Sequence, residues 1–383
     1  MSSAVVHDVV ASSKVAQWGT RALFLVAGLA AAAWASLVPD AKARTGLDEG
    51  QLGVVLLCLG VGSILAMPVA GVLSTRHGCR KVLVVCGSLM CVSLPLLALA
   101  SNIYTLGLAL FLFGAVIGMF DCVMNVQAII VERDSNVPLM SGFHGFYSLG
   151  GIVGAALTSG IMMAGFSPLN TVLLVTMLAA TILAFGLLNS LPYGNPSEGP
   201  AFAFPRGVVL FLGLLCFTVF LAEGSMLDWS AVLLTDKHGM SHAQAGFGFA
   251  CFSVAMTIGR LTGDRIVDRL GRRLVVIVGG ALAAAGILVA TMLPGWPLAL
   301  LGFALVGLGC SNIVPVLFTA VGRQTRMPQL VAVPAMSTLG YAGVLAGPAG
   351  IGFIAHHSSL STAFLLVAVM MVGVAISGRF LKV

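Results

Sequence analysis

Three acidic residues lie inside long apolar stretches of this 383-residue chain: Asp121, Glu223 and Asp228. A charged side chain at the centre of a bilayer costs about 2.5–3.5 kcal/mol on insertion scales, so each is a candidate functional group. A carboxyl group that leaves water can exchange a proton near neutral pH. These residues could therefore carry protons through a membrane.

Asp121 is the first candidate for proton coupling, because it lies roughly 15 Å from the cytosolic end of its predicted span, at about 1.5 Å per residue. Asn125 follows one helical turn later and shares its face. Glu223 is the second candidate, since Gly224 and Ser225 beside it leave space. The alternative for either acid is a structural hydrogen bond to a neighbouring helix.

A second set of residues could contact a polar solute. Trp34 and Trp229 occupy nearly corresponding places in two spans and could stack on a sugar-like ring, although tryptophans at the membrane interface are the common alternative. Asp228 could simply be hydrated, and His144 could either link gating to protonation or cap its helix. The predicted substrate-binding residues are Trp34, Asn125, His144, Tyr147, Asp228, Trp229, Asn312 and Tyr341. We expect Trp34, Asp121, Asn125, Glu223 and Asn312 to face one cavity.

The composition places the chain in a membrane: 59% of the residues are hydrophobic, 8% are charged, and the mean hydropathy is +1.07. A span needs roughly 20 apolar residues. Because a backbone in lipid must satisfy its own hydrogen bonds, the continuous apolar stretches predict helices. The twelve predicted spans are about 18–38, 51–73, 82–100, 104–130, 140–163, 169–189, 207–230, 243–264, 274–293, 298–321, 332–354 and 361–378.

The chain contains a duplication with an offset of 193 residues. The basic turn Arg76–Lys81 recurs in altered form as Arg269–Arg273, and the same offset relates Gly114 to Gly307. Duplicated apolar units are typical of secondary transporters. No P-loop is present in the sequence, which argues against a pump driven directly by ATP.

A segment rich in turn residues separates the two copies. It predicts a cytosolic linker at 191–206, between an N-terminal six-helix bundle at 1–190 and a C-terminal six-helix bundle at 207–383.

Sixteen of the nineteen Lys and Arg residues fall on one side of the predicted spans, and only Lys42, Arg44 and Lys237 fall on the other. This asymmetry predicts that both termini are cytosolic in a bacterial-type inner membrane. The net charge of +6 forms no stripe that would bind nucleic acid. The cysteine positions predict no disulfide, and no spacing of residues indicates a metal site or a cofactor.

The basic turns predict a cytosolic gate. Arg80 and Glu132 should lie at the inner membrane surface, and Arg269 and Arg273 are close to Asp268 in sequence. Exposed ion pairs contribute under about 1 kcal/mol each, so they can bias an equilibrium without locking it. The predicted gate residues are Arg76, Arg80, Glu132, Arg260, Asp268, Arg269 and Arg273. Arg260 could instead extend to the lipid headgroups.

The turn between the second and third spans resembles the signature Gly-x-x-x-Asp-Arg-x-Gly-Arg-Arg of the major facilitator superfamily. The first copy, Gly71–Lys81, has Thr75 at the acidic position, whereas the second keeps Asp268 and has Asp264 in place of the glycine. A closer similarity is to the fucose-permease-like branch and to YbjJ-type permeases. The stretches that carry it are Asp121–Asn125, His144–Gly150 and Ala222–Trp229.

The resemblance implies an all-α membrane protein with twelve transmembrane helices in two pseudo-symmetric six-helix bundles. It also implies alternating access, often proton symport of sugars, and a coupling role for Asp121. One departure is that fucose permeases have an acid in the first helix four residues before a proline, whereas this chain has Ala35 before Pro39. A coupling scheme based on two acids therefore does not transfer.

These observations together predict a secondary transporter, not an enzyme, that moves a small polar, sugar-like solute with protons and acts as a monomer in the lipid bilayer. Two alternatives stay open, namely efflux of amphipathic drugs and a non-transporting receptor of the same fold. The low aromatic fraction of 8% and the polar candidate residues favour a polar solute over a drug.

The Lys and Arg asymmetry predicts that the 191–206 linker faces the cytosol. A Ser197→Cys variant, made in a background without native cysteines, should therefore resist an impermeant thiol reagent added to intact cells and react after lysis. Labelling from outside intact cells would show that the orientation is reversed.

Overall fold

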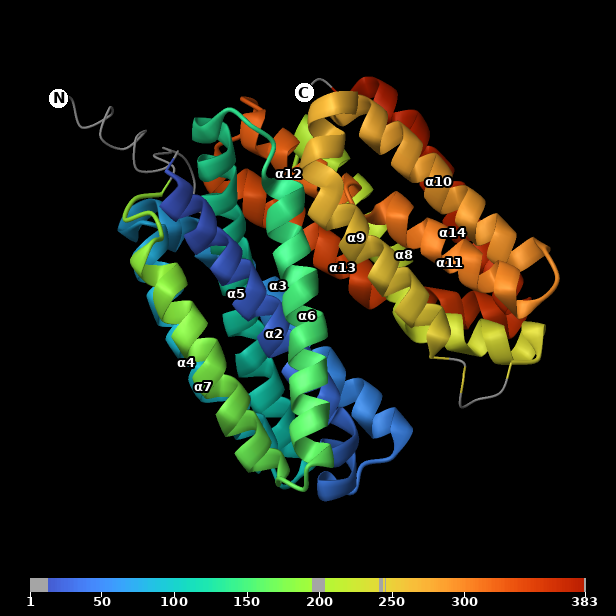
Figure 1. Ribbon diagram of the computed structural model, residues 1–383, viewed down its shortest axis with the longest axis horizontal. Coiled ribbons are helices and arrows are strands. Elements are labelled where there is room, and N and C mark those ends of the chain that lie inside the picture. The colour runs from blue at the N-terminus through green and yellow to red at the C-terminus, as the bar shows by residue number, and fades with distance from the viewer. Residues whose placement is uncertain (1–12, 195–203, 241–243, 245, 382–383) are drawn as a thin grey trace. The chain divides into compact units, whose positions relative to one another are not determined.

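The structure is a computed structural model that describes residues 13–194, 204–240, 244 and 246–381. These residues form α-helices and one short 3-10 helix, Gly378–Phe380. The helices are α2 (Lys14–Thr45), α3 (Glu49–His77), α4 (Cys79–Leu99), α5 (Ile103–Ser135), α6 (Met140–Met163), α7 (Pro168–Leu188), α8 (Gly207–His238), α9 (Phe247–Leu270), α10 (Arg272–Met292), α11 (Trp296–Cys310), α12 (Ile313–Arg323), α13 (Gln329–His357) and α14 (Leu360–Ser377) (Figure 1). The all-α membrane fold is confirmed.

Eleven helical segments in the described chain are long and apolar enough to cross a membrane, and α11 and α12 together make one of them. The predicted span at 243–264 corresponds to α9, which is not among the eleven. Its second half contains charged residues such as Arg260, Asp264 and Arg265, which lower its mean hydropathy. The charged residues of α9 therefore set it apart from the other long helices by composition.

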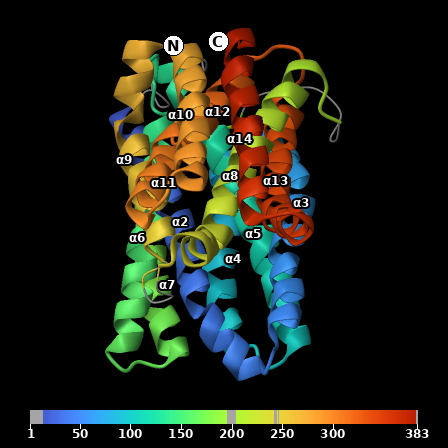
Figure 2. The same ribbon diagram turned by 90° about the vertical axis from the view of Figure 1, so that its right-hand side faces the viewer.

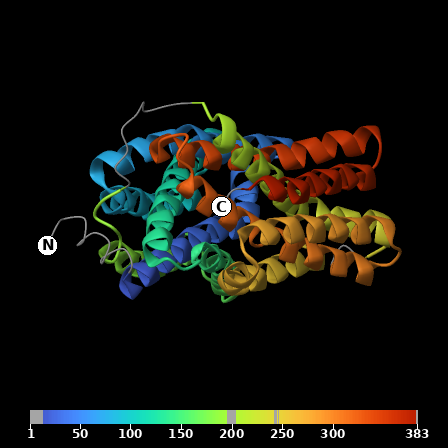
Figure 3. The same ribbon diagram turned by 90° about the horizontal axis from the view of Figure 1, so that it is seen from above.

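The chain forms two compact units. Unit 1 contains Met1–Val137, Phe146–Phe204 and Met327–Thr338, and unit 2 contains Pro138–Gly145, Pro205–Arg326 and Leu339–Val383. In unit 1, α3 packs along α5 (Figure 2). In unit 2, α10 packs against α11 and α14 (Figure 3). The boundaries inside α6 and α13 are again 193 residues apart. The domain limits 190 and 207 stay predictions, and linker residues 195–203, including Ser197, lie outside the described residues.

The duplicated turns have the same backbone conformation in both copies. Gly46, after α2, has φ 68°, and Gly239, after α8, has φ 64°. Gly78, between α3 and α4, has φ 84°, and Gly271, between α9 and α10, has φ 78°. Positive φ favours glycine because a side chain would clash with its own backbone. The repeat that the sequence predicts thus extends to backbone geometry.

Close helix crossings also repeat. Gly114 in α5 lies directly on the backbone of Leu59 in α3, and Gly307 in α11 lies on the backbone of Phe252 in α9. Both residues of the second contact lie 193 positions after the corresponding residues of the first. Small residues allow helices in a membrane to approach closely, and dispersion contacts between the backbones then stabilise the pair.

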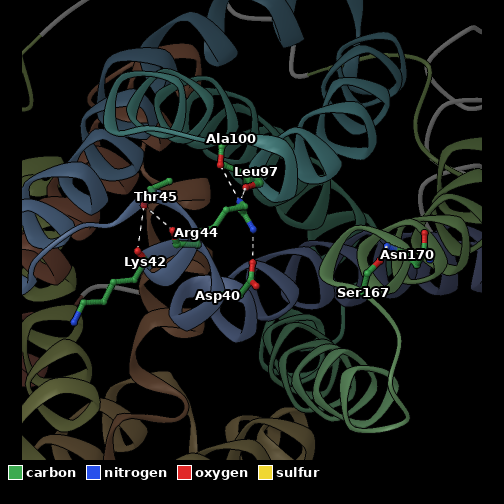
Figure 4. A network of polar contacts seen from close by, with 9 residues as sticks. Asp40, Lys42, Arg44, Thr45, Leu97, Ala100, Ser167 and Asn170 are labelled. Atoms are coloured by element: carbon green, nitrogen blue, oxygen red, sulfur yellow. Dashed lines mark hydrogen bonds and ion pairs between the residues drawn. The ribbon is translucent and has the colours of Figure 1, made fainter.

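Basic side chains cap helix ends at equivalent places. Arg44 in the last turn of α2 donates 2.9 Å hydrogen bonds to the carbonyl oxygens of Leu97 and Ala100 at the end of α4 and pairs with Asp40 (Figure 4). Lys237, 193 residues after Arg44, donates to the carbonyl oxygen of Thr291 at the end of α10. A cation near a helix C-terminus also opposes the negative end of the helix dipole. Two of the three basic residues predicted on the outer side therefore act as caps.

The glycine crossings predict a position-dependent effect of added side chains. Gly114→Val should push α3 and α5 apart and lower the free energy of unfolding by about 1–3 kcal/mol, as overpacking does. Gly107→Val is the matched control two turns earlier in α5, because there the nearest atom to an added Cβ is Cys58 Sγ at 3.8 Å, an ordinary contact. Thermal unfolding of the two purified variants makes the comparison. Equal melting temperatures would contradict the crossing.

Candidate functional site

Asp121 lies in the middle of α5 and is half-buried. Its carboxyl group makes no hydrogen bond or ion pair with any residue that the structure describes. The neighbouring Asn125 is buried and donates from Nδ2 to the backbone oxygen of Asp121 at 3.0 Å. The predicted pair is thus joined through the backbone, and the carboxyl group stays available for a proton.

Glu223 in α8 and Arg260 in α9 form an ion pair. Arg260 Nη2 lies 3.2 Å from Glu223 Oε1 and 3.5 Å from Oε2. The Arg260 side chain is 8% exposed and that of Glu223 is 18% exposed. The sequence suggested a coupling role for Glu223 and a gate role for Arg260, whereas the structure brings them into one site within unit 2.

A break between α11 and α12 holds Arg260 in place. Pro315 has no N–H group, so the carbonyl oxygen of Ser311 lacks its usual helical donor. Arg260 Nε lies 3.4 Å from this oxygen. Interrupted helices often build transporter sites, because their free backbone groups can bind charged partners.

Asn312 fixes the same break against α9. Its Nδ2 atom donates to the carbonyl oxygen of Gly259 at 3.1 Å and to Ser311 Oγ at 3.0 Å. A side chain at Gly263 would collide with the Asn312 amide, which shows how close α9 is. Asn312 thus supports the backbone next to Arg260, and its predicted contact with substrate stays a prediction.

The first turn of α6 joins this group of residues. The backbone N–H of Gly142 donates to Asp264 Oδ1 at 2.9 Å. The His144 ring is buried against Phe318 of α12, with ring centroids 5.6 Å apart. Asp264 was not among the predicted site residues. One sign of it is present in the sequence, because Asp264 stands where the signature has a glycine. It caps α6 because helix N-termini carry free N–H groups.

The other predicted binding residues are distributed over both units. Trp34 belongs to unit 1 and is buried, with 4% of its surface exposed. In unit 2, the Trp229 ring packs on Gly352 of α13. The Tyr341 ring lies edge-on to the Phe220 ring, with the two ring centroids 6.3 Å apart. Asp228 is exposed.

Tyr147 belongs to unit 1 with Trp34, Asp121 and Asn125, and its backbone oxygen lies over Gly28 of α2. Among the predicted site residues, unit 2 therefore brings together Glu223, Arg260, Asn312 and His144.

The predicted gate residues differ in their surroundings. Arg80 Nε donates to the carbonyl oxygen of Ser190 at 2.9 Å and its Nη2 to that of Leu188 at 3.2 Å, so it caps α7. Glu132 is buried. The remaining residues are exposed and form no ion pair within the described chain; they are Arg76, Asp268, Arg269 and Arg273.

Comparison with known proteins identifies the family. The model of the Major Facilitator Superfamily matches residues 22–233 and 212–382, which together span nearly the whole chain. The chain belongs to this superfamily. It is therefore an integral membrane protein and a transporter of the MFS type, as the signature turns indicated.

Relatives of this MFS transporter align over almost their full lengths. An uncharacterized MFS-type transporter of Yersinia pestis is 51% identical over 380 residues, which are 99% of each chain. The membrane protein MosC of Rhizobium meliloti is 32% identical over 93% of this chain and 88% of its own. The transporter FucP in its outward conformation, a fucose:proton symporter of E. coli, has a similar fold, with a TM-score of 0.81, 18% identity, and coverage of 95% and 98% of the two chains.

The ion pair predicts a coupled effect on the stability of this MFS transporter. Arg260→Gln leaves Glu223 without its cation, so the melting temperature should fall by about 5–10 °C, in line with the cost of breaking a buried pair. The double variant Glu223→Gln, Arg260→Gln should recover part of that loss. Melting curves of the four proteins give the coupling energy, and strictly additive shifts would contradict the pair.

Proposed function

We propose that this transporter moves a small polar solute by alternating access and couples the movement to protons at Asp121. The observation that carries the proposal is the Asp121 carboxyl group, which lies mid-helix in α5 without a side-chain partner in the described residues. An intramembrane acid with no cation beside it is best suited to travel protonated and to release its proton at the other face.

Glu223 is the second candidate for the coupling proton. Its negative charge is balanced by Arg260 at 3.2 Å, so protonation would leave the buried guanidinium without its counter-ion. This cost favours Asp121 for the proton and Glu223 for a role that depends on its partner.

A sugar-like solute is supported by the similar fold of FucP, which is a fucose:proton symporter. Trp34, Trp229 and Tyr341 supply aromatic and hydroxyl groups of the kind that contact sugar rings. Since Ala35 stands where fucose permeases have an acid, we assign the proton step to Asp121 alone.

The Lys and Arg distribution supports an inner-membrane location with both termini cytosolic. We propose the basic turns as a weak gate at that face, because exposed charges such as Arg269 and Arg273 can form and break pairs at little cost. We also propose two functional halves, 1–190 and 207–383, and a monomeric transporter.

Asp121→Asn tests the coupling role, because asparagine keeps the shape of the side chain but cannot release a proton. In proteoliposomes the variant should lose solute accumulation driven by a proton gradient by about tenfold or more while solute exchange persists. The pH dependence of solute binding should also become flatter, since the titrating group is absent.

Asp134→Asn is the matched control, because Asp134 is an acid near the end of the same helix and, unlike Asp121, is paired, with the exposed Arg133. It should transport like the unmodified protein. A folded Asp121→Asn protein that still accumulates solute in response to a proton gradient would refute the role of Asp121.

A further inference from the structure

The two partners of the Glu223–Arg260 pair are held unequally. Both Glu223 oxygens contact a single nitrogen, Nη2, at 3.2 and 3.5 Å. Charge-assisted hydrogen bonds between guanidinium and carboxylate groups are usually about 2.7–2.9 Å long, and the best are bidentate. The pair is therefore longer and less complementary than a guanidinium group can achieve with a carboxylate that approaches freely.

Arg260 is the fixed partner. Its Nε atom lies 3.4 Å from the Ser311 carbonyl oxygen, and the preceding residue, Gly259, accepts a hydrogen bond from Asn312 at 3.1 Å. Its side chain is 8% exposed. If this guanidinium moved, the Ser311 carbonyl oxygen would lose the hydrogen bond from Arg260. That oxygen has no helical donor, because Pro315 has no N–H group.

Glu223 is the movable partner. Within the described residues its carboxylate is held by Arg260 alone, and its side chain is 18% exposed, more than twice the fraction for Arg260. The carboxylate can therefore turn toward water when another anion takes its place. The reverse exchange is unfavourable, because a cation bound to Glu223 would break the 3.2 Å contact with the buried Arg260 guanidinium and place a second positive charge near it.

We infer that the transported solute carries a carboxylate, which replaces Glu223 on Arg260. When no solute is bound, the Glu223 carboxylate occupies the place on Arg260 that the solute carboxylate would take, and it balances the charge of the guanidinium. This assignment rests on the proposed function and narrows the polar solute to a small organic acid, such as a sugar acid. A planar guanidinium group selects carboxylates by two parallel hydrogen bonds, which a neutral alcohol cannot form.

Two other titratable groups lie near Arg260. The buried His144 ring lies on Phe318 and within electrostatic range of Arg260. The nearby acid Asp264 accepts the N–H group of Gly142 at 2.9 Å and is thereby engaged in capping α6. Of the acids Glu223 and Asp264, Glu223 is the one whose carboxylate contacts Arg260, whereas Asp264 is engaged at the start of α6.

The test compares matched probes that differ in one carboxylate: glucuronate with glucose, and gluconate with sorbitol. Binding to the purified full-length protein is measured by thermal shift and by calorimetry, and uptake is measured in proteoliposomes. We expect an acid to bind more tightly than its neutral counterpart. Glu223→Gln should tighten acid binding about tenfold, because it weakens the internal competitor, and should leave the neutral probes unchanged.

The double variant Glu223→Gln, Arg260→Gln keeps the site free of an unpaired charge, so it separates recognition from folding. It should lose the preference for acids and keep any binding of neutral probes. Arg133→Gln, which removes an exposed cation at the end of α5, is the control for net charge.

Each outcome discriminates. Acid affinity that stays the same or falls in Glu223→Gln overturns the inference, as does an acid preference that survives in the double variant. Uptake of neutral probes without any binding of acids overturns the inference and leaves the proposed function standing. Absence of uptake of every probe, with no acid bound to either protein, counts against both.

Discussion

Backbone carbonyl groups without a helical donor impose the main constraint on this structure. Inside a bilayer no water is present to satisfy them, so a carbonyl group that a proline frees within a span needs a donor from elsewhere in the chain. Carbonyl groups at helix ends can be satisfied by side chains as well as by water. Here basic side chains supply that donor repeatedly. The pairs of donor and acceptor residues are Arg44 with Leu97 and Ala100, Arg80 with Leu188 and Ser190, Lys237 with Thr291, and Arg260 with Ser311.

The same constraint connects stability with the candidate site. Arg260 is present in a sparsely charged chain where it can satisfy a carbonyl group that Pro315 leaves free. Once the guanidinium is buried, it requires an anion, and Glu223 provides one. A structural requirement of one helix thus accounts for a buried cationic group in unit 2 with an acidic partner beside it.

The sequence predicted the helices and the repeated turns because these depend on local patterns: apolar runs of span length, and glycines at positions that need positive φ. It did not predict the pairing of Glu223 with Arg260, nor the cap that Arg80 forms on α7. Such contacts depend on which helices pack against each other in three dimensions, and a single sequence does not show which helices are neighbours. Asp264 was partly visible, because it replaces the glycine of the signature.

The two copies also show how a duplicated scaffold diverges. Gly71 and Asp264 occupy equivalent positions, yet Gly71 lies on the backbone of Leu330 in α13 while Asp264 caps α6 through Gly142. One position gives a close approach of two helices and the other gives a hydrogen bond. The divergence changes chemistry without changing the course of the chain.

The matching turns at Gly46 and Gly239 bear on what a helix end requires of the sequence. Their backbone angles agree within a few degrees, whereas the capping residues beside them, Arg44 and Lys237, differ in identity and in acceptors. The two copies therefore share the turn geometry, while a different basic side chain satisfies the end of the neighbouring helix in each. The fold requires a hydrogen-bond donor at this place, and either basic amino acid can supply it.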